Sequence, residues 1–223
     1  MISIIIPILN ESRALPATLK NVLSQVGDYE IIVVDGGSSD TSCEIVRHYQ
    51  QIKILTAARG RASQMNAGAM QAKGEWLLFL HADTLLSESA LTSIDELPET
   101  ILAGSFKHQF SGKSWGLRFI PWLHNFRCRR TLIFYGDQAL FIRRSLFEKI
   151  GGFPDVPILE DLLFGEQLRK ATEPTILDVY VTTDSRKFEQ MGIWKSLWRV
   201  VVILSSHKLG MQIRPLKFFT HVR

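Results

Sequence analysis

The sequence predicts an α/β fold in which a mostly parallel central sheet is flanked by helices. Residues 2–80 contain four apolar runs that alternate with three segments of helical character. The runs at 30–35 and 76–80 are nearly continuous stretches of β-branched or large apolar residues, which is typical of strands buried on both faces. Regular alternation of such strands with helices indicates a parallel sheet built from βαβ units.

The first half of the chain follows this alternation closely. Pro16 falls in the first turn of the first expected helix, where a missing N–H costs little, and Asp40 or Thr41 can cap the second helix. The expected elements are a strand at 2–8, a helix at 14–26, a strand ending at Asp35, a helix at 41–50, a strand at 53–56, a helix at 60–73 and a strand ending near His81.

Beyond residue 83 the pattern is less regular. Its expected elements are a strand at 101–110, an aromatic and basic stretch at 114–134, a strand at 138–142, a helix at 144–150 and a helix starting near 158–160 and reaching about 171. The length of 223 residues fits one domain. We expect a nucleotide-binding half at 1–85, an acceptor half at 86–185 and a basic appendage at 186–223.

Cysteine usage and the first residues favour a cytoplasmic protein. Cys43 and Cys128 lie far apart, and no CxxC or Cys/His ligand spacing occurs, so neither a disulfide framework nor a zinc site is expected. The segment 1–7 lacks a basic region and a small-residue cleavage site, and we interpret it as the first strand instead of a signal sequence.

The C-terminal segment is strongly basic. Residues 186–223 hold eight Lys and Arg and one Glu, a net charge of +7, so the first 185 residues carry −3 of the total of +4. Apolar residues at 193–204 recur at steps of three and four, which predicts an amphipathic helix too short to span a bilayer. Its tryptophans argue against a nucleic-acid partner. The segment either packs on its own domain or contacts the inner face of the cytoplasmic membrane.

Polar residues at the ends of the predicted strands suggest a nucleotide site. Asp35 enters a glycine-containing turn at 36–40, where a carboxylate can accept a hydrogen bond from a base or ribose. Neither GxGxxG nor a P-loop sequence occurs. Arg59 and Arg61 start the helix at 60–73, where a guanidinium can meet a diphosphate or remain solvated. Asn66 and Gly68, inside that helix, indicate close packing against a ligand or the first strand.

Two further groups of side chains suggest chemistry at the same edge. Asp83 can hold a hard cation such as Mg²⁺ or Mn²⁺ with substrate phosphates completing its shell, while His81 is either a ligand or a structural histidine. The adjacent acids Glu160 and Asp161 provide a candidate general base or a helix N-terminal acid pair. Asp137 and Gln138 are further candidates for polar groups near the metal or the acceptor.

In this order the motifs resemble those of the family 2 glycosyltransferases, which have the type A (GT-A), Rossmann-like nucleotide-diphospho-sugar transferase fold. They are PILNE (7–11), VVDGGSSD (33–40), GRASQMNAG (60–68), HAD (81–83), GGF (151–153) and ED (160–161). The forms GRASQMNAGA, LHADT and YGDQALFIRR are similar to a compact bacterial subgroup of transferase 2, or arsenosugar-biosynthesis, type.

The resemblance implies an inverting, metal-dependent transfer of one sugar from a nucleoside-diphosphate sugar to an acceptor hydroxyl. A UDP-sugar is favoured and a GDP-sugar is the alternative. It implies the following roles: Pro7, Glu11 and Asp35 in the nucleoside pocket, Arg61 at the diphosphate, Asp83 at the metal and Asp161 as general base. His81 replaces the first acid of the usual Asp-x-Asp motif, and the Gln-x-x-Arg-Trp of processive members is absent.

Two other functions stay open at this point. One is a nucleotide-sugar-binding protein without turnover, which His81 motivates, and the other is a nucleotidyltransferase of similar architecture. The stretch at 115–130 is a candidate part of the acceptor site, because its aromatic residues can stack on a sugar or lie against lipid and its arginines suit an anionic acceptor. The alternative is a helix of the core or of a homodimer.

Overall fold

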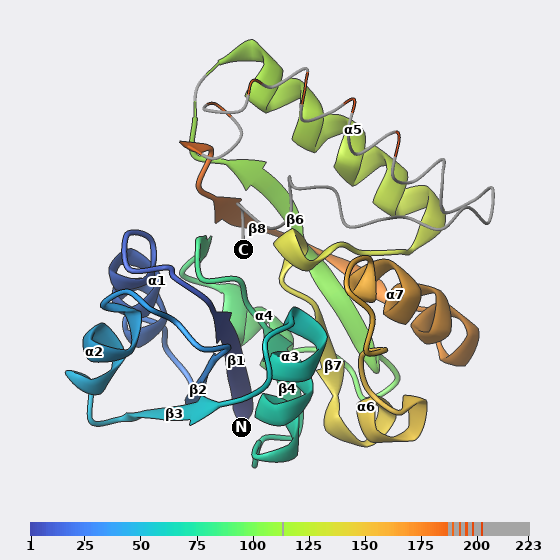
Figure 1. Cartoon of the computed structure of the whole chain (residues 1–223). Coiled ribbons are helices and arrows are strands. Elements are labelled where there is room, and N and C mark those ends of the chain that lie inside the picture. Colours follow the sequence, from blue (N-terminus) through green and yellow to red (C-terminus); the bar gives the residue numbers. More distant parts are fainter. Residues whose placement is uncertain are drawn as a thin grey trace.

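A computed structural model describes residues 1–112 and 114–186, together with residues 189, 192, 195, 198 and 202. Within these residues one sheet has the strand order β3-β2-β1-β4-β7-β6-β8-β5 (Figure 1). The strands are β1 (Ile2–Ile8), β2 (Tyr29–Asp35), β3 (Ile52–Thr56), β4 (Trp76–Phe79), β5 (Thr84–Leu86), β6 (Ala103–Phe110), β7 (Phe141–Arg143) and β8 (Thr175–Thr183). The helices are α1 (Leu15–Leu23), α2 (Ser42–Arg47), α3 (Arg61–Met70), α4 (Ala90–Asp95), α5 (Trp115–Thr131), α6 (Arg144–Ile150) and α7 (Glu160–Ala171), and η1 (Gly136–Gln138) is a 3-10 turn.

The expectation of a mostly parallel sheet is confirmed. Strands β3, β2, β1 and β4 are parallel neighbours, as their alternation with helices predicts. Strand β7 is antiparallel to β4 and β6, while β6 and β8 are parallel to each other. Only β7 and β5 of the described strands therefore oppose the common direction, since β5 is antiparallel to β8.

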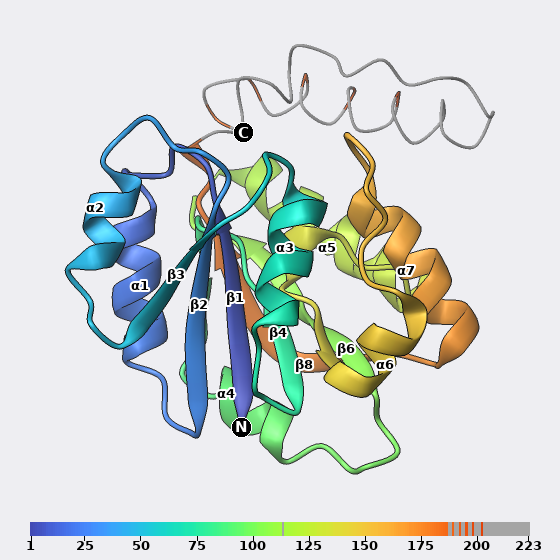
Figure 2. The same ribbon diagram turned by 60° about the horizontal axis from the view of Figure 1, so that its bottom comes forward.

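Helices cover both faces of the sheet, which explains the continuous apolar runs. Along β1, Ile4 and Ile6 pack into the core that holds α1, α2 and α4, whereas Ile5 between them packs into the core that holds α3, α6 and α7. Figure 2 shows α1 and α3 on opposite sides of the parallel strands. A strand buried on both faces has no position at which a polar side chain can face water.

Gly68 allows α3 to lie against the first strand. A Cβ atom at this position would come within 2.5 Å of Ile5 Cγ2 and 3.1 Å of Val34 Cγ2. The close helix–strand approach that the sequence predicts around this position is therefore confirmed for Gly68. It fixes the height of the N-terminus of α3 above the strand ends.

Several elements differ from those expected. The strand predicted at 138–142 is displaced to 141–143, because residues 136–138 form η1 and the side chain of Gln138 turns into the protein interior. The aromatic and basic stretch forms the long helix α5, and β5, α4 and β8 were not predicted. The amphipathic helix predicted at 193–204 lies outside the described residues, except for Lys195, Trp198 and Val202.

None of the described helices combines the length and the apolar character that a bilayer-spanning helix needs.

Candidate active site at the carboxyl ends of the strands

The strand order has a topological switch point between β1 and β4. From β1 the chain goes to β2 and β3 on one side and then crosses to β4 on the other side. Ligands of open α/β sheets bind at such a switch point, beyond the carboxyl ends of the strands. Pro7 lies near the end of β1, and Asp35 is the last residue of β2, opposite Ile8. The turn that contains His81 and Asp83 follows β4.

Asp35 shapes the loop at the end of β2. Its carboxylate accepts hydrogen bonds from the backbone N–H groups of Gly37 at 3.1 Å and Ser38 at 3.0 Å. Burial acts to raise the pKa of Asp35, but hydrogen bonds from the side chain and backbone of Ser38 and from Gly37 outweigh it and lower the pKa. Asp35 is therefore an ionised acceptor at the strand end, where it also holds the loop in place.

A second set of hydrogen bonds joins this loop to the one after β1. Asp40 accepts from the backbone N–H of Ser12 and from the hydroxyl of Ser42, and the hydrogen bonds outweigh burial and lower the pKa of Asp40 to about 2. The Ser42 hydroxyl in turn accepts the N–H of Glu11 at 2.9 Å. The two loops are thus connected before any ligand binds, which limits the ordering cost of binding.

Gln64 is a structural residue of this region that the sequence interpretation did not single out. Its Nε2 donates to the carbonyl oxygens of Ile8 and Val34, each at 2.8 Å, where β1 and β2 end. A Cβ atom at Gly36 would come within 2.9 Å of its amide, so glycine is required there by packing. The sequence signal for this contact between α3 and the strand ends is a glutamine three positions after the first residue of α3.

Arg61 lies at the centre of a cluster of acidic side chains. It is the first residue of α3, and its Nε atom is 3.0 Å from Oε1 of Glu160, whose side chain is 2% exposed. Burial opposes the charge of Arg61, but the surrounding carboxylates outweigh this effect and raise its pKa. In order of influence they are Glu160, Asp161, Asp83 and Asp137. The structure therefore brings together side chains that the sequence places on four separate segments.

His81 is neutral and contacts the same guanidinium. Burial and the charge of Arg61 lower the pKa of His81 to about 4. The Nη1 atom of Arg61 lies 3.2 Å from Nε2 of His81. Because a guanidinium can only donate, Nε2 is the acceptor and the proton of the neutral ring is on Nδ1. In this arrangement Nε2 of His81 is directed at Arg61, and a metal-binding role for the ring stays a prediction.

Asp161 is the second residue of α7 and is held by two backbone donors. Its Oδ2 accepts from the N–H of Gly136 at 2.9 Å, and its Oδ1 accepts from the N–H of Leu162 at 2.8 Å. Burial and the neighbouring charge of Glu160 raise the pKa of Asp161, although Arg61 and the two N–H groups partly oppose this effect. A carboxylate with a raised pKa is a better proton acceptor than an ordinary one.

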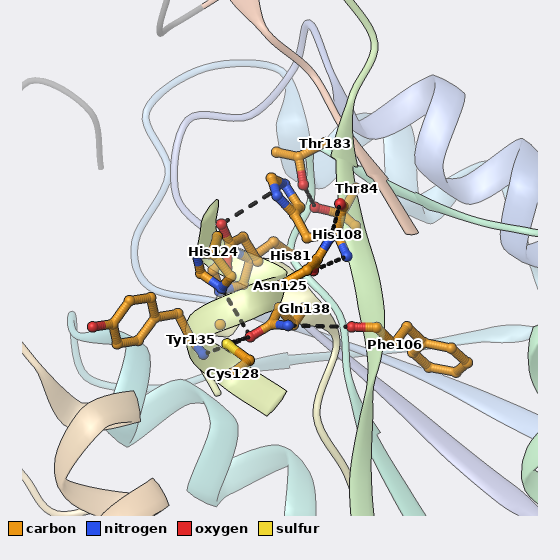
Figure 3. A network of polar contacts seen from close by, with 12 residues as sticks. His81, Thr84, Phe106, His108, His124, Asn125, Cys128, Tyr135, Gln138 and Thr183 are labelled. Carbon is orange, nitrogen blue, oxygen red and sulfur yellow. Dashed lines mark hydrogen bonds and ion pairs between the residues drawn. The ribbon is translucent and has the colours of Figure 1, made fainter. Parts of the chain in front are cut away.

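Asp137 and Gln138, adjacent in η1, have different surroundings. Oδ2 of Asp137 is 3.7 Å from Nε2 of His108, and its Oδ1 is buried without a hydrogen-bond partner among the described residues. Gln138 is fully buried, and Figure 3 shows its amide inside a network with His124 and Cys128. Its Oε1 lies 2.9 Å from Nε2 of His124 and 3.0 Å from Sγ of Cys128. Gln138 thus holds η1 in place, and direct acceptor contact by it stays a prediction.

Asn66 contacts the glycine turn that precedes α7. Its Nδ2 donates to the carbonyl of Phe153 at 2.8 Å, and its Oδ1 accepts the N–H of Phe153 at 2.9 Å. Gly152 has a φ of +77°, and a Cβ atom there would come within 2.7 Å of Oδ1 of Asn66. The amide therefore ties α3 to the turn at 151–153, and a donor contact by Asn66 stays a prediction.

The acidic cluster is a reasonable environment for a divalent cation with few protein ligands. Among the described residues, no group of three or more His, Cys, Asp and Glu side chains is arranged to enclose a metal ion. Mg²⁺ and Mn²⁺ accept carboxylate oxygens and retain positions for water and phosphate. Asp83 supplies such oxygens, and the unpaired Oδ1 of Asp137 is a second oxygen donor in the same electrostatic field. The donor set thus fits a cation that shares its shell with a ligand.

A small cavity of about 20 Å³ lies among these residues. Its polar lining includes Arg61, His81 and Asp161, and its apolar lining includes Phe153 and Phe164. A space of this size holds about one water molecule. The charged groups are therefore closely packed.

Several known proteins are similar to this chain in sequence. Residues 3–153 match the protein family described as "Glycosyl transferase family 2". A "PGL/p-HBAD biosynthesis glycosyltransferase" of Mycobacterium bovis is 34% identical over 207 residues, which cover 86% of this chain and 78% of the relative. A "Poly-beta-1,6-N-acetyl-D-glucosamine synthase" of Staphylococcus epidermidis is 36% identical over 95 residues, covering 40% of this chain and 23% of the relative.

Solved structures share the fold at lower sequence identity. A mannosyltransferase from Pyrobaculum calidifontis, in complex with GDP-Man and Mn²⁺, has a TM-score of 0.64 and 22% identity over 81% of this chain. S. aureus TarS in complex with UDP-GlcNAc has a TM-score of 0.67 and 20% identity over 83% of this chain. The match covers 56% and 58% of those two chains, so this chain spans a little over half their length. The predicted GT-A fold is confirmed by these likenesses.

Proposed function

The chain belongs to glycosyl transferase family 2, and from this membership we propose that it transfers one sugar from a nucleoside-diphosphate sugar to an acceptor hydroxyl with inversion at the anomeric carbon. The observation that carries the proposal is the environment of Asp161. Its carboxylate has a raised pKa, is fixed by the Gly136 N–H and lies in the electrostatic field of Arg61. A carboxylate with a raised pKa and a guanidinium are thus neighbours, which supports the assignment of a base and a charge-stabilising group.

Asp161 acts as the general base in this proposal. Its carboxylate takes the proton of the acceptor hydroxyl as that oxygen forms a bond to the anomeric carbon. The bond between the anomeric carbon and the diphosphate oxygen breaks, and its electron pair leaves with the diphosphate. Attack on the face opposite the leaving group inverts the configuration. A base held by backbone donors needs no reorganisation for this step.

The leaving diphosphate gains negative charge, which the site must stabilise. Arg61 carries a positive charge within the acidic cluster, and its guanidinium is well suited to phosphate oxygens. Asp83 would hold a divalent cation, Mn²⁺ or Mg²⁺, which when bound supplies charge stabilisation to the diphosphate. Because four carboxylates surround Arg61, the cluster has a net negative charge that a bound cation would offset.

The nucleoside end of the donor would lie over the connected loops after β1 and β2. Asp35 provides an ionised acceptor there, and Pro7 and Glu11 lie on the adjoining strand and loop. The structural relatives contain UDP-GlcNAc in one case and GDP-Man in another. We therefore propose that the donor is a UDP-sugar or a GDP-sugar.

Thermal-shift titration with UDP- and GDP-sugars, with and without Mn²⁺ or Mg²⁺, tests donor binding because a ligand of the native state raises Tm. Nucleoside-diphosphate release is measured in the same samples. Asp83→Ala should weaken the metal-dependent shift. Asp161→Asn should retain the shift and lose transfer or donor hydrolysis. Asp155→Asn, an exposed acid on the turn before α7, is the matched control and should behave as wild type.

The outcomes separate the alternatives. A metal-dependent shift without nucleoside-diphosphate release under any condition would indicate a binding protein without turnover. Pyrophosphate release from a nucleoside triphosphate and a sugar phosphate would indicate a nucleotidyltransferase. Wild-type activity in Asp161→Asn would remove the assigned base.

A further inference from the structure

A large groove lies beside the acidic cluster, between α5 and the strands β6 and β8. Its volume is about 550 Å³, which is within the usual range of small-molecule sites. Figure 1 shows α5 spanning this side of the sheet. Asn125 of α5 attaches the helix to β6 by accepting the N–H of His108 at 3.0 Å and donating to its carbonyl at 2.9 Å. The groove is therefore bounded by elements that are fixed to one another.

The outer wall of the groove is aromatic. Trp122 and Phe126 of α5 line it and are 61% and 48% exposed, and their rings stack with a centroid separation of 6.0 Å. The stack continues along the helix through Phe119 to Trp115, with centroid separations of 5.8 and 5.4 Å. Four stacked rings on one helix face present a flat apolar surface that favours an aromatic or alkyl body.

The same groove carries positive charge. Its lining includes Lys107, Arg118 and Arg129 and, among the residues that the structure describes, no Asp or Glu; Oε1 of Glu189 approaches it only at Gly112. Lys107 is paired with Asp178, which lies outside the lining. Arg118 and Arg129 form no ion pair with another described residue. The two arginines are therefore free to pair with an anionic group, and arginine is well suited to phosphate or carboxylate.

The inner end of the groove is polar and adjoins the acidic cluster. His108 lines the groove, is 1% exposed, and has no hydrogen-bond partner for either ring nitrogen among the described residues. Its Nε2 is 3.7 Å from Oδ2 of Asp137. Asp137 follows Gly136, whose N–H holds Asp161. Figure 3 shows His108 beside the network that positions η1. A buried imidazole with unused hydrogen-bonding capacity is costly unless a ligand or water satisfies it.

We propose that this groove binds the acceptor, and that the acceptor is an anionic amphiphile with an aromatic or alkyl body. Its body lies on the Trp122 and Phe126 rings, its anionic group pairs with Arg118 or Arg129, which lie at the two ends of that ring pair on α5, and its hydroxyl end approaches His108 and, beyond it, Asp161. This inference rests on the proposed glycosyl transfer, since it names the class of the second substrate. The charge of the lining and its aromatic wall together favour this class over a neutral sugar.

Phenyl phosphate is a suitable probe because it combines an aromatic body with a phosphate. Its Kd for the full chain is measured by isothermal titration and compared with that of inorganic phosphate and of phenol. Wild type should bind phenyl phosphate at least tenfold more tightly than either fragment. The double substitution Arg118→Gln/Arg129→Gln should weaken phenyl phosphate binding at least tenfold, and Trp122→Ala should weaken it severalfold.

The matched control is Arg169→Gln/Lys170→Gln, which removes the same charge from the exposed end of α7 and should not alter the Kd. Tm and circular dichroism establish that each variant is folded. Equal binding by the groove and control variants, or no preference for phenyl phosphate over its fragments, would overturn the inference. So would binding to anionic phosphatidylglycerol vesicles without binding of phenyl phosphate, which would make the aromatic face a membrane contact.

UDP- and GDP-sugar binding to wild type is measured in parallel. If a donor binds and phenyl phosphate does not, this inference fails while the proposed function stands. If no donor binds or is hydrolysed, the proposed function itself fails.

Discussion

Replacing Arg61 with methionine should destabilise the protein strongly, although Arg61 is a candidate substrate-binding residue. Its Nε atom is 3.0 Å from the carboxylate of Glu160, whose side chain is 2% exposed. For two unit charges at 3.0 Å, Coulomb's law with an effective dielectric constant of about 20 gives roughly 5 kcal/mol. Breaking a buried pair by removing one partner costs about 3–5 kcal/mol, because the remaining charge is uncompensated. For a chain of this size that loss corresponds to a Tm decrease of about 6–20 °C.

Urea unfolding followed by tryptophan fluorescence measures the loss as a free energy of unfolding. The double variant Arg61→Met/Glu160→Gln should recover part of the stability lost in Arg61→Met, because the unpaired buried charge is then removed. Arg59→Met, on an exposed arginine two positions earlier, should change the free energy by less than about 0.5 kcal/mol.

The loss should also depend on pH. Without Arg61 the pKa of Asp161 rises further in the folded state, because a positive charge that opposed its protonation is gone. A carboxyl whose folded pKa is raised favours folding at low pH and opposes it as pH increases through that pKa. The deficit of Arg61→Met relative to wild type should therefore be smaller at pH 5 than at pH 8. The reasoning would be refuted if the free energy of unfolding of Arg61→Met at pH 8 were within about 1 kcal/mol of the wild-type value. It would also be refuted if the loss in Arg61→Met/Glu160→Gln were the sum of the losses in the two single variants.

Three further predictions follow from single contacts. Burial and the neighbouring Glu160 raise the pKa of Asp161, so the acid limb of the pH profile of kcat should lie above the ordinary aspartate pKa of about 3.9. Activity should fall as the pH decreases through that limb. Asp161→Asn should reduce kcat by about 10²–10⁴-fold. Gly68→Ala should cost about 1–3 kcal/mol in urea unfolding because the added methyl overlaps the first strand, whereas Met70→Ala on the exposed face of the same helix should cost little. Asn66→Ala removes both hydrogen bonds to the backbone of Phe153 and should cost about 2–3 kcal/mol, and an unchanged urea midpoint would contradict that role.

The parallel half of the fold was predictable because its signals are local. Apolar runs bounded by turn residues mark β1 to β4 within a few residues of their observed limits, and the alternation with helices determines their parallel pairing. The strand-end motifs were found for the same reason. In a parallel sheet, residues that end separate strands meet at one edge, so Asp35, His81 and Asp83 could be assigned to one crevice before their contacts were known.

Strands β5 and β8 and helix α4 were not predicted, because their sequences are short or mixed in polarity and their pairing depends on distant segments. Strand β8, for example, pairs with β6 although residues 111–174 separate the two strands. The contacts that the site residues make could not be predicted from the sequence either. Nothing local to α3 indicates that Arg61 meets Glu160, or that the amide of Asn66 binds the backbone of Phe153.

The sequence by itself therefore determined the fold class, the family and the edge of the sheet at which the polar residues gather, because these follow from periodicity and from motifs within short segments. Only the tertiary structure decided which side chains are paired, which are buried and which remain open to a ligand. Those properties depend on charges and surfaces that come from separate elements, and burial changes both the pKa of a group and the cost of leaving it unpaired. The acidic cluster around Arg61 and the basic, aromatic groove beside it exist only after α3, α5 and α7 have packed against the sheet.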